Sequence, residues 1–237
     1  MEATTTDAQL IDEAVRWAKA NRKAFAKTVT SAEMFPGEKR PVAVFMAGSP
    51  GAGKTEASKA LVSELGSFLR IDPDEYRQAI PGYDGTNSSL MQRAVSYLVA
   101  AVLDRAFALS QSFLLDGTLS SYEVAEKNVQ RCLDKDRQVQ VVYVYQEPHL
   151  AWQFVQAREL VEGRGIPAER FVHQFFESRA VVDRLKAKFA TDIKVDVLLK
   201  NIDGSSGKYL ANVPSLKSAV PIPHTEDEVA KMVASLS

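Results

Sequence analysis

One segment of this chain, residues 48–55, constrains the fold more than any other. It fits the pattern G-x-x-x-x-G-K followed by S or T in full, after an apolar run and before a stretch of helical periodicity. In that context glycines let backbone N–H groups approach phosphates, and the start of the helix adds a positive dipole. A plain glycine turn beside a solvated lysine is the alternative, and the strand-to-helix context disfavours it. We therefore predict a phosphate-binding loop made of Gly48, Ser49, Pro50, Gly51, Ala52, Gly53, Lys54 and Thr55.

Two side chains of this loop carry its chemistry. In such loops the lysine, here Lys54, reaches the β- and γ-phosphates, and the hydroxyl group, here of Thr55, ligates the Mg²⁺ that accompanies a nucleotide. The sequence has no Asn-Lys-x-Asp motif of the kind that reads guanine. We therefore expect a nucleoside triphosphate with Mg²⁺, either ATP or GTP, and we favour ATP.

Apolar runs alternate with helical stretches along the chain. Runs without polar alternation are typical of strands buried on both faces of a parallel sheet, and they occur at 42–46, 67–71, 112–115, 139–145 and, more weakly, 195–199. Helical periodicity occupies 53–66, 88–110, 121–135 and 167–190. This order predicts an α/β fold of three αβα layers, with a parallel sheet of about five strands and right-handed crossovers.

The chain divides into a core and two flanking segments. We predict a helical N-terminal extension at 1–40, a core at 41–200 with a short lid near 159–167, and a tail at 201–237. The leading helix at 6–27 is amphipathic, with Thr6 or Asp7 as its cap, and it either packs as a simple extension or folds over the nucleotide site as an inhibitor. We favour the extension. The tail ends in a short helix from about 226, indicated by Thr225 with Glu228.

Composition excludes several classes of protein. The chain has 237 residues, 46% of them hydrophobic and 25% charged, and a formal net charge of -1, which argues against a main role in neutralising nucleic acid. The single Cys132 offers no internal disulfide, and the N-terminus lacks the pattern of a secretory signal. The longest apolar stretch, 94–103, is about half of what a bilayer requires. We expect a cytoplasmic protein that binds neither nucleic acid nor membrane.

Asp72 follows the predicted second strand. Ligands of open α/β sheets bind just beyond the carboxyl ends of the strands, so Asp72 should face the phosphate site. There it could bind an attacking hydroxyl and accept its proton. The alternative is that Asp72, or Asp74, caps the next helix, for which Pro73 is a suitable first residue.

Asp116 repeats this arrangement after the third strand. A carboxylate after four apolar residues is the usual Mg²⁺ partner in P-loop folds, whereas the strand at 139–145 ends before Gln146. We therefore predict that Asp116 serves the Mg²⁺ and substrate site. Gly117 permits a ligand to approach the backbone, and Thr118 is placed to hydrogen-bond the acceptor. A plain strand-to-loop turn is the alternative.

Two arginines lie in the predicted lid. Glycines bracket Arg164, one helix ends before it and Pro167 begins another. Arg158 and Arg164 could close over the γ-phosphate, neutralise charge in the transition state and help to exclude water. Alternatively, both arginines pair with Glu159, Glu162 or Glu169 on a solvated surface.

Together these motifs resemble the zeta toxin family of P-loop kinases, whose relatives include chloramphenicol phosphotransferase. The resemblance spans about 42–199, and the matching segments are 48–55, 69–74, 115–118, Arg158 and 164–167. It departs from the family at Asp116, where the best-known members carry Glu, and in a shorter segment between the two arginines. A further acidic residue, which the family places in the helix before the third strand, has no clear counterpart around Ala100.

The resemblance implies roles for individual residues. Lys54 and Thr55 would bind the ATP phosphates, Asp72 would be the base that activates a sugar hydroxyl, and Thr118 would lie in the substrate site. Arg158 and Arg164 would clamp the phosphates. Family members phosphorylate the 3′-hydroxyl of the amino sugar in UDP-N-acetylglucosamine, and many are held inactive by a small antitoxin. The resemblance thus implies a phosphotransferase with an alcohol acceptor and an antitoxin partner.

Two other functions remain open at this point. A kinase of a nucleoside, an antibiotic or a polynucleotide end would use the same residues. A nucleotide-dependent switch or ATPase would use the phosphate loop without an acceptor.

Overall fold

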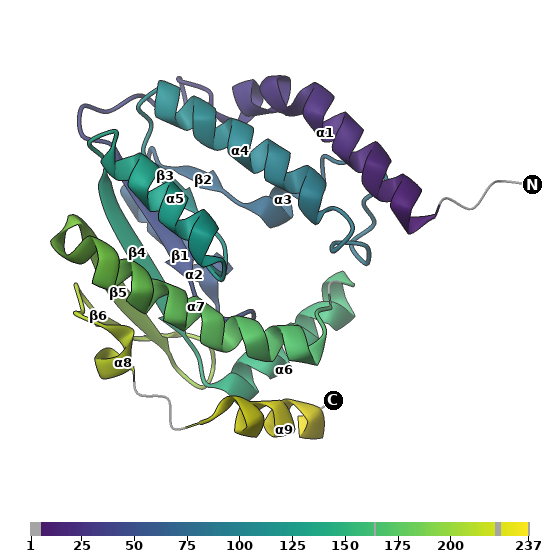
Figure 1. Cartoon of the computed structure of the whole chain (residues 1–237), viewed down its shortest axis with the longest axis vertical. Helices are drawn as coiled ribbons and strands as arrows, with labels where there is room; N and C mark the ends of the chain where they lie inside the picture. Colours follow the sequence, from purple (N-terminus) through teal and green to yellow (C-terminus); the bar gives the residue numbers. More distant parts are fainter. Residues whose placement is uncertain (1–5, 164, 221–223, 237) are drawn as a thin grey trace, which may run out of the picture.

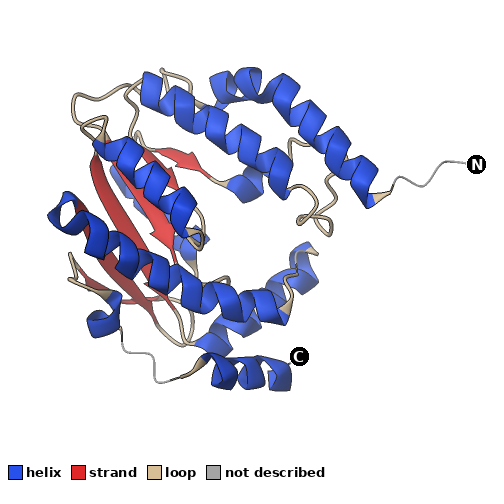
Figure 2. Cartoon of the chain, in the orientation of Figure 1, coloured by secondary structure: helices blue, strands red, loops and turns tan. Residues whose placement is uncertain are grey.

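The computed structural model describes residues 6–163, 165–220 and 224–236. Within them, six strands form one sheet with the order β2-β3-β1-β4-β5-β6 (Figures 1 and 2). The strands are β1 (Val42–Ala47), β2 (Leu69–Ile71), β3 (Phe113–Leu115), β4 (Gln138–Tyr145), β5 (Ile193–Lys200) and β6 (Ser206–Leu210). The helices are α1 (Asp7–Val29), α2 (Lys54–Leu65), α3 (Pro73–Arg77), α4 (Gln92–Ala108), α5 (Tyr122–Leu133), α6 (Pro148–Glu162), α7 (Ala168–Phe189), α8 (Leu216–Ala219) and α9 (Glu226–Leu236), with a short 3₁₀-helix at Ala190–Asp192.

The predicted α/β class and parallel sheet are confirmed. Strand β1 lies at the centre and pairs in parallel with β3 and β4, while β2 pairs in parallel with β3 and β5 with β4. The chain moves to one side of β1 for β2 and β3 and to the other side for β4 and β5. Such a reversal of strand order opens a crevice beyond the carboxyl end of the central strand, which here is the start of the phosphate-binding loop.

Helices cover both faces of the sheet, as the three-layer prediction requires. On one face Val44 of β1 and Val142 of β4 pack with Leu61 of α2. The other face, which includes Phe45 and Tyr143, packs against α4, α5 and α7, and these helices lie in front of the strands in Figure 1. Since successive strand residues point to opposite faces, burial on both sides explains why these strands are continuous apolar runs.

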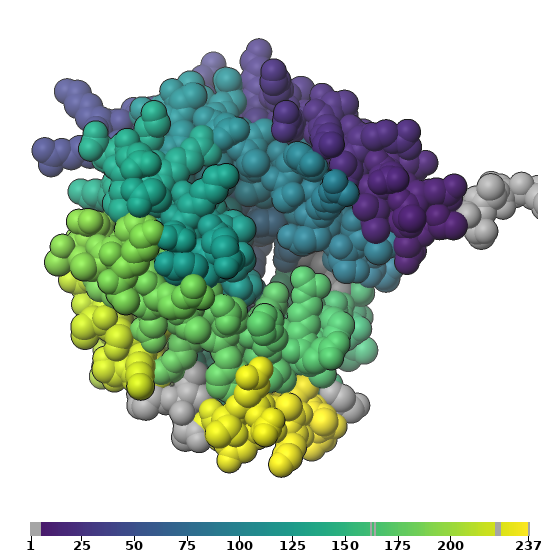
Figure 3. All heavy atoms as spheres, viewed as in Figure 1, coloured from purple at the N-terminus to yellow at the C-terminus, as the bar shows by residue number. Residues whose placement is uncertain are grey.

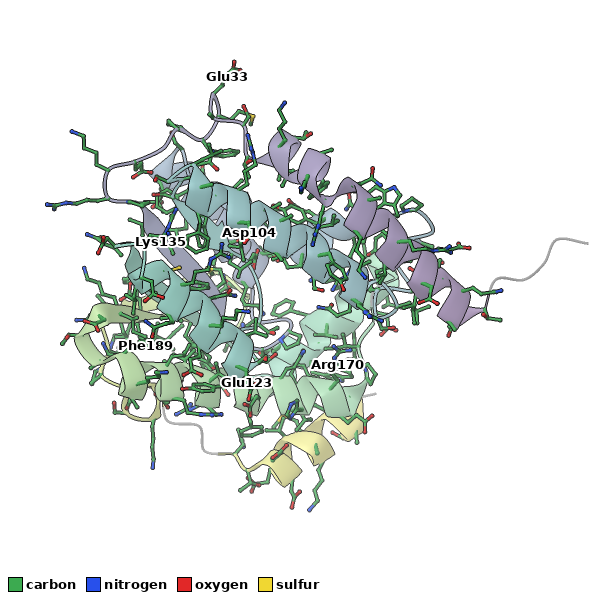
Figure 4. The ribbon with its side chains drawn as sticks, turned by 45° about the horizontal axis from the view of Figure 1, so that its top comes forward. Glu33, Asp104, Glu123, Lys135, Arg170 and Phe189 are labelled. Carbon is green, nitrogen blue, oxygen red and sulfur yellow. The ribbon has the colours of Figure 1, made fainter. Side chains whose placement is uncertain are left out.

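Helix α1 begins as the sequence predicts. Thr6 is its N-cap, and the Oγ1 atom of Thr6 accepts a hydrogen bond from Gln9 N at 3.3 Å. The helix lies along α4 (Figure 1), and Phe25 meets Tyr76 of α3 edge-on at 4.9 Å between ring centroids. The connection that follows α1 projects outward at Glu33 (Figure 4). This packing on α4 agrees with a structural extension.

The C-terminal segment contains a strand that the sequence analysis missed. Strand β6 pairs antiparallel with β5, so the sheet has one more strand than we expected. The short helix near the end is confirmed as α9, where Glu228 N donates to Thr225 Oγ1 at 3.3 Å. The proposed division at residues 40 and 200 stays a prediction. Among the described residues, no helix is both long and apolar enough to span a bilayer.

We predict that Arg137→Met destabilises the protein. The Arg137 guanidinium is buried and donates to Gln111 O at 2.6 Å and to Ala106 O at 3.0 Å. Its removal leaves buried acceptors without this donor, so the free energy of unfolding in urea should fall by about 1–3 kcal/mol. The exposed Lys135→Met is the control and should change it by less than about 0.5 kcal/mol. Equal effects of the two substitutions on the free energy of unfolding would contradict a stabilising role of the Arg137 hydrogen bonds.

Candidate active site

The phosphate-binding loop connects the end of β1 to the start of α2 in a tightly enclosed path. Gly48 has a φ of +133°, and a Cβ atom there would lie 2.3 Å from Val144 O at the end of β4. Gly51 has a φ of +72°, and a Cβ atom there would lie 2.0 Å from Ala151 O in α6. Side chains at either position would collide with backbone, so the fold itself requires glycine there.

The remaining loop residues complete the turn. Ser49 and Ala52 are buried, and Ala52 N donates to Ser49 O at 3.3 Å. Pro50 and Thr55 are half-buried, and Thr55 lies in the first turn of α2, where backbone N–H groups of a helix have no partner within the helix. The loop therefore presents backbone donors at the carboxyl edge of the sheet.

Lys54 bends back over the loop. Its Nζ atom donates to Gly48 O at 3.0 Å and to Ser49 O at 2.6 Å. Burial lowers the pKa of Lys54 to about 8, although the nearby carboxylates of Asp116 and Asp74 act in the opposite direction. An anionic phosphate would raise this pKa and supply stronger acceptors than the two carbonyl oxygens. The ammonium group is therefore placed to bind phosphate.

The two predicted carboxylates meet beside this loop. Asp72 and Asp116 are each only 6% exposed, and the Oδ2 atoms of both accept hydrogen bonds from the same nitrogen, Nη2 of Arg70, at 2.5 Å and 2.7 Å. They come from the ends of β2 and β3, which pair in parallel. The prediction that both would lie at the carboxyl edge of the sheet is thus met.

Asp72 also has the structural role that we considered as an alternative. It is the N-cap of α3, and its Oδ1 atom accepts a hydrogen bond from Asp74 N at 2.8 Å. Burial raises the pKa of Asp72, the charge of Asp116 adds to this effect, and Arg70 opposes it. A raised pKa makes a carboxylate a better proton acceptor. Capping and proton transfer are therefore compatible in this residue.

Arg70 is a site residue that the sequence analysis missed. Besides the two aspartates, its Nε atom donates to Ser58 Oγ at 3.0 Å and its Nη1 atom to Glu75 at 2.6 Å. Burial alone would lower the pKa of Arg70, but these carboxylates raise it above its usual value. The available signal was a charged residue inside a short apolar run, two residues before the candidate base Asp72.

Asp116 and Thr55, the two residues predicted to ligate Mg²⁺, are connected through Ser58. Ser58 Oγ lies 2.6 Å from Asp116 Oδ2 and 2.9 Å from Thr55 O, so one hydroxyl group links the two predicted ligand residues. Asp116 Oδ2 is held by Ser58 and Arg70, whereas its Oδ1 atom has no protein hydrogen bond among the described residues. An oxygen donor set with one carboxylate oxygen left over fits a hard cation that keeps several waters.

Thr118 makes one contact through its backbone and one through its hydroxyl group. Gly48 N donates to Thr118 O at 3.3 Å, which attaches the segment after β3 to the phosphate-binding loop. Thr118 Oγ1 lies 2.9 Å from Ser120 Oγ. A Cβ atom at Gly117 would meet nothing within 4 Å, so there is open space beside this residue.

The predicted lid begins at the end of α6. Arg158 Nη2 lies 3.5 Å from Asp74 Oδ2, so this ion pair connects α6 to α3. Gly163, with a φ of +70°, ends the helix beside Thr86, and Arg164 lies outside the described residues. Figure 3 shows the surface hollowed between the blue-teal residues of α4 with its preceding loop and the green residues of α6. The aspartates, the loop and Arg158 thus surround one site.

Two comparisons with known proteins point to the same family. The profile of the zeta toxin family matches residues 26–213. Toxin PezT of Streptococcus pneumoniae serotype 4 is 27% identical over 122 residues, which cover 48% of this chain and 48% of PezT. The aligned region thus spans about half the length of that curated relative.

Solved structures share the fold. A structure of the PezAT chromosomal toxin–antitoxin system of Streptococcus pneumoniae matches with a TM-score of 0.70 and 19% identity, over 91% of this chain and 94% of that chain. AvrRxo1-ORF1:AvrRxo1-ORF2 with sulphate ions matches with a TM-score of 0.57 and 13% identity, over 98% and 86%. AvrRxo1-ORF1:-ORF2 with ATP matches with a TM-score of 0.55 and 14% identity, over 86% and 66%.

We predict that Gly51→Ala weakens ATP binding at least about tenfold, because its Cβ atom would collide with Ala151 O and displace the loop. Gly66→Ala is a matched control: Gly66 has a similar φ of +76°, but a Cβ atom there meets nothing within 4 Å. Both residues have a positive φ, so both substitutions carry a backbone cost. Titration calorimetry with ATP should separate them, and equal affinities would contradict the loop assignment.

Proposed function

This chain belongs to the zeta toxin family, and we propose that it is an ATP-dependent kinase that transfers the γ-phosphoryl group of ATP to a hydroxyl of a small molecule. The observation that carries the proposal is the pair of buried carboxylates, Asp72 and Asp116, beside the phosphate-binding loop. A switch that hydrolyses ATP requires no second carboxylate placed for an acceptor, so this pair favours a kinase.

The loop holds the nucleotide in this proposal. Backbone N–H groups of residues 48–55 bind the phosphates, and Lys54 leaves the carbonyl oxygens of Gly48 and Ser49 to reach the β- and γ-phosphates. Thr55 and Asp116 would hold the Mg²⁺, which would neutralise phosphate charge. With the phosphates fixed, an acceptor on the Asp72 side is positioned for in-line attack.

Asp72 is the proton acceptor in this proposal. As the acceptor oxygen forms a bond to the γ-phosphorus, the bond from that phosphorus to the bridging oxygen breaks and ADP leaves. The proton of the acceptor hydroxyl passes to the Asp72 carboxylate, whose raised pKa suits this role. Arg158, together with Arg164, neutralises charge on the transferred group.

For the acceptor we propose a nucleotide sugar similar to UDP-N-acetylglucosamine, on the strength of the family resemblance. Thr118 and Asp116 lie at the end of β3, where such a substrate would be held. A nucleoside, an antibiotic or a polynucleotide 5′-end are the other acceptors to test. Labelled ATP with a panel of UDP-sugars, nucleosides, chloramphenicol and a DNA 5′-end, followed by identification of the phosphorylated product, decides among them. ADP release that is indifferent to every acceptor would instead favour a switch or ATPase.

We also propose an antitoxin as protein partner, because structures similar to this chain come from a toxin–antitoxin system and from the AvrRxo1-ORF1:-ORF2 complex. If the chain is a toxin, its induced expression in a bacterial host should arrest growth. Asp72→Asn should remove that arrest at equal expression. Growth arrest by both forms would separate toxicity from phosphoryl transfer.

We predict that Asp72→Asn lowers phosphoryl transfer by about 10²–10⁴-fold, the usual contribution of a general base. Asparagine is also a good N-cap, so its side chain can still accept from Asp74 N and the fold should be retained. ATP affinity by titration calorimetry should change little, and Asp134→Asn, at the exposed end of α5, is the control. Near-normal transfer would remove Asp72 from the mechanism.

We predict that Lys54→Ala weakens both ATP binding and turnover, because it removes the cation that reaches the β- and γ-phosphates. Lys59→Ala, on the exposed side of the same helix, is the matched control and should leave both unchanged. An unaltered affinity of Lys54→Ala for ATP would count against the nucleotide site.

A further inference from the structure

Arg70 is the only residue described here that hydrogen-bonds both candidate carboxylates. It lies at the middle of the three-residue strand β2, and its guanidinium contacts side chains from four places in the chain. Nε donates to Ser58 of α2, Nη1 to Glu75 of α3, and Nη2 to Asp72 and Asp116, at the ends of β2 and β3.

These contacts are largely removed from water. The Arg70 side chain is 11% exposed, and those of Asp72 and Asp116 are 8% and 5% exposed. Two carboxylates this close and this buried repel each other and are costly to keep ionised. Because one nitrogen bonds both, their Oδ2 atoms lie no farther apart than the two hydrogen bonds allow. The guanidinium therefore provides the positive charge that holds the pair together.

Arg70 also fixes the orientation of Asp72. The Oδ1 atom of Asp72 accepts from Asp74 N at 2.8 Å, and its Oδ2 atom accepts from Arg70 at 2.5 Å. With both oxygens held, the carboxylate cannot rotate, yet an ionised carboxylate has about four lone-pair sites, so it can still accept a proton. Since the orientation of a reacting group strongly affects its rate, this restraint bears directly on proton transfer.

We propose that Arg70 is a positioning residue: its guanidinium holds Asp72 in the orientation that accepts the proton and keeps Asp116 beside it before the nucleotide binds. The catalytic part of this inference rests on the proposed kinase function. A planar group with donors in a fork can span all four partners, whereas the ammonium of lysine, a single donor atom, cannot. Comparing arginine with lysine at position 70 therefore separates the effect of the guanidinium's shape from the effect of its charge.

The first test is a cycle on turnover, with ATP and whichever acceptor the panel identifies. Arg70→Met should lower kcat about 10²-fold and leave the dissociation constant of ATP within about threefold of wild type. In the Asp72→Asn background the same substitution should lower kcat by less than about threefold, because Arg70 acts through Asp72. Arg70→Lys should recover part of the lost kcat.

The cycle needs a control variant at an arginine elsewhere in the fold. Arg131→Met removes an arginine that pairs with Asp104 at 2.7 Å on α4, outside this cluster, and should leave kcat unchanged. A role of Arg70 in folding alone would lower kcat by the same factor with and without Asp72. That result, or an unaltered kcat in Arg70→Met, would overturn the proposal.

The second test requires no acceptor. Arg70→Met leaves buried carboxylates without their partner, so Tm should fall by roughly 5–15 °C. Adding Asp116→Asn removes one of these charges and should raise Tm above that of Arg70→Met alone, which keeps the test usable if the single variant folds poorly. Additive losses would overturn the bridging role. If Tm shows the coupling but no acceptor is phosphorylated, the proposed kinase function fails and the bridge remains.

Discussion

The close approach of the phosphate-binding loop to β4 and α6 is the constraint on which the rest of the site depends. Because Gly48 lies against Val144 O and Gly51 against Ala151 O, the loop can follow only one path from β1 to α2. That path starts at the centre of the sheet, from the strand between β3 and β4. Strands β2 and β3 end at the same edge of the sheet. A parallel sheet thus brings residues distant in sequence to one edge without any binding energy from a ligand.

Opposite charges lie close together at this edge of the sheet, and the net charge of the whole chain does not reveal them. Formal charges of the whole chain nearly cancel, yet Arg70 and Lys54 lie among Asp72, Asp116 and Asp74. Burial raises the pKa of Asp72 and lowers that of Lys54, so both shifts favour the neutral forms. Arg70 opposes this for Asp72 because a guanidinium stays protonated even when it is buried.

The sequence predicted the positions of the aspartates because strand ends in a parallel sheet share an edge, and the motif predicted Lys54 and Thr55 directly. It did not predict Arg70, since 67–71 was interpreted as a strand buried on both faces. Strand β2 is in fact at the edge of the sheet, and there a polar side chain can reach the site. Strand β6 was missed because its residues, 206–210, are nearly all exposed and an exposed edge strand has no apolar alternation.

The ion pairs of the site differ in burial and therefore in the cost of breaking them. Arg158 and Asp74 are each 40% exposed and 3.5 Å apart, and an ion pair of that kind contributes at most about 1 kcal/mol. The bonds of Arg70 to Asp72 and Asp116 are shorter and buried. Removing one partner of a buried ion pair leaves an uncompensated charge and destabilises the fold by about 3–5 kcal/mol. The buried bonds of Arg70 are thus costlier to break than the exposed ion pair between Arg158 and Asp74.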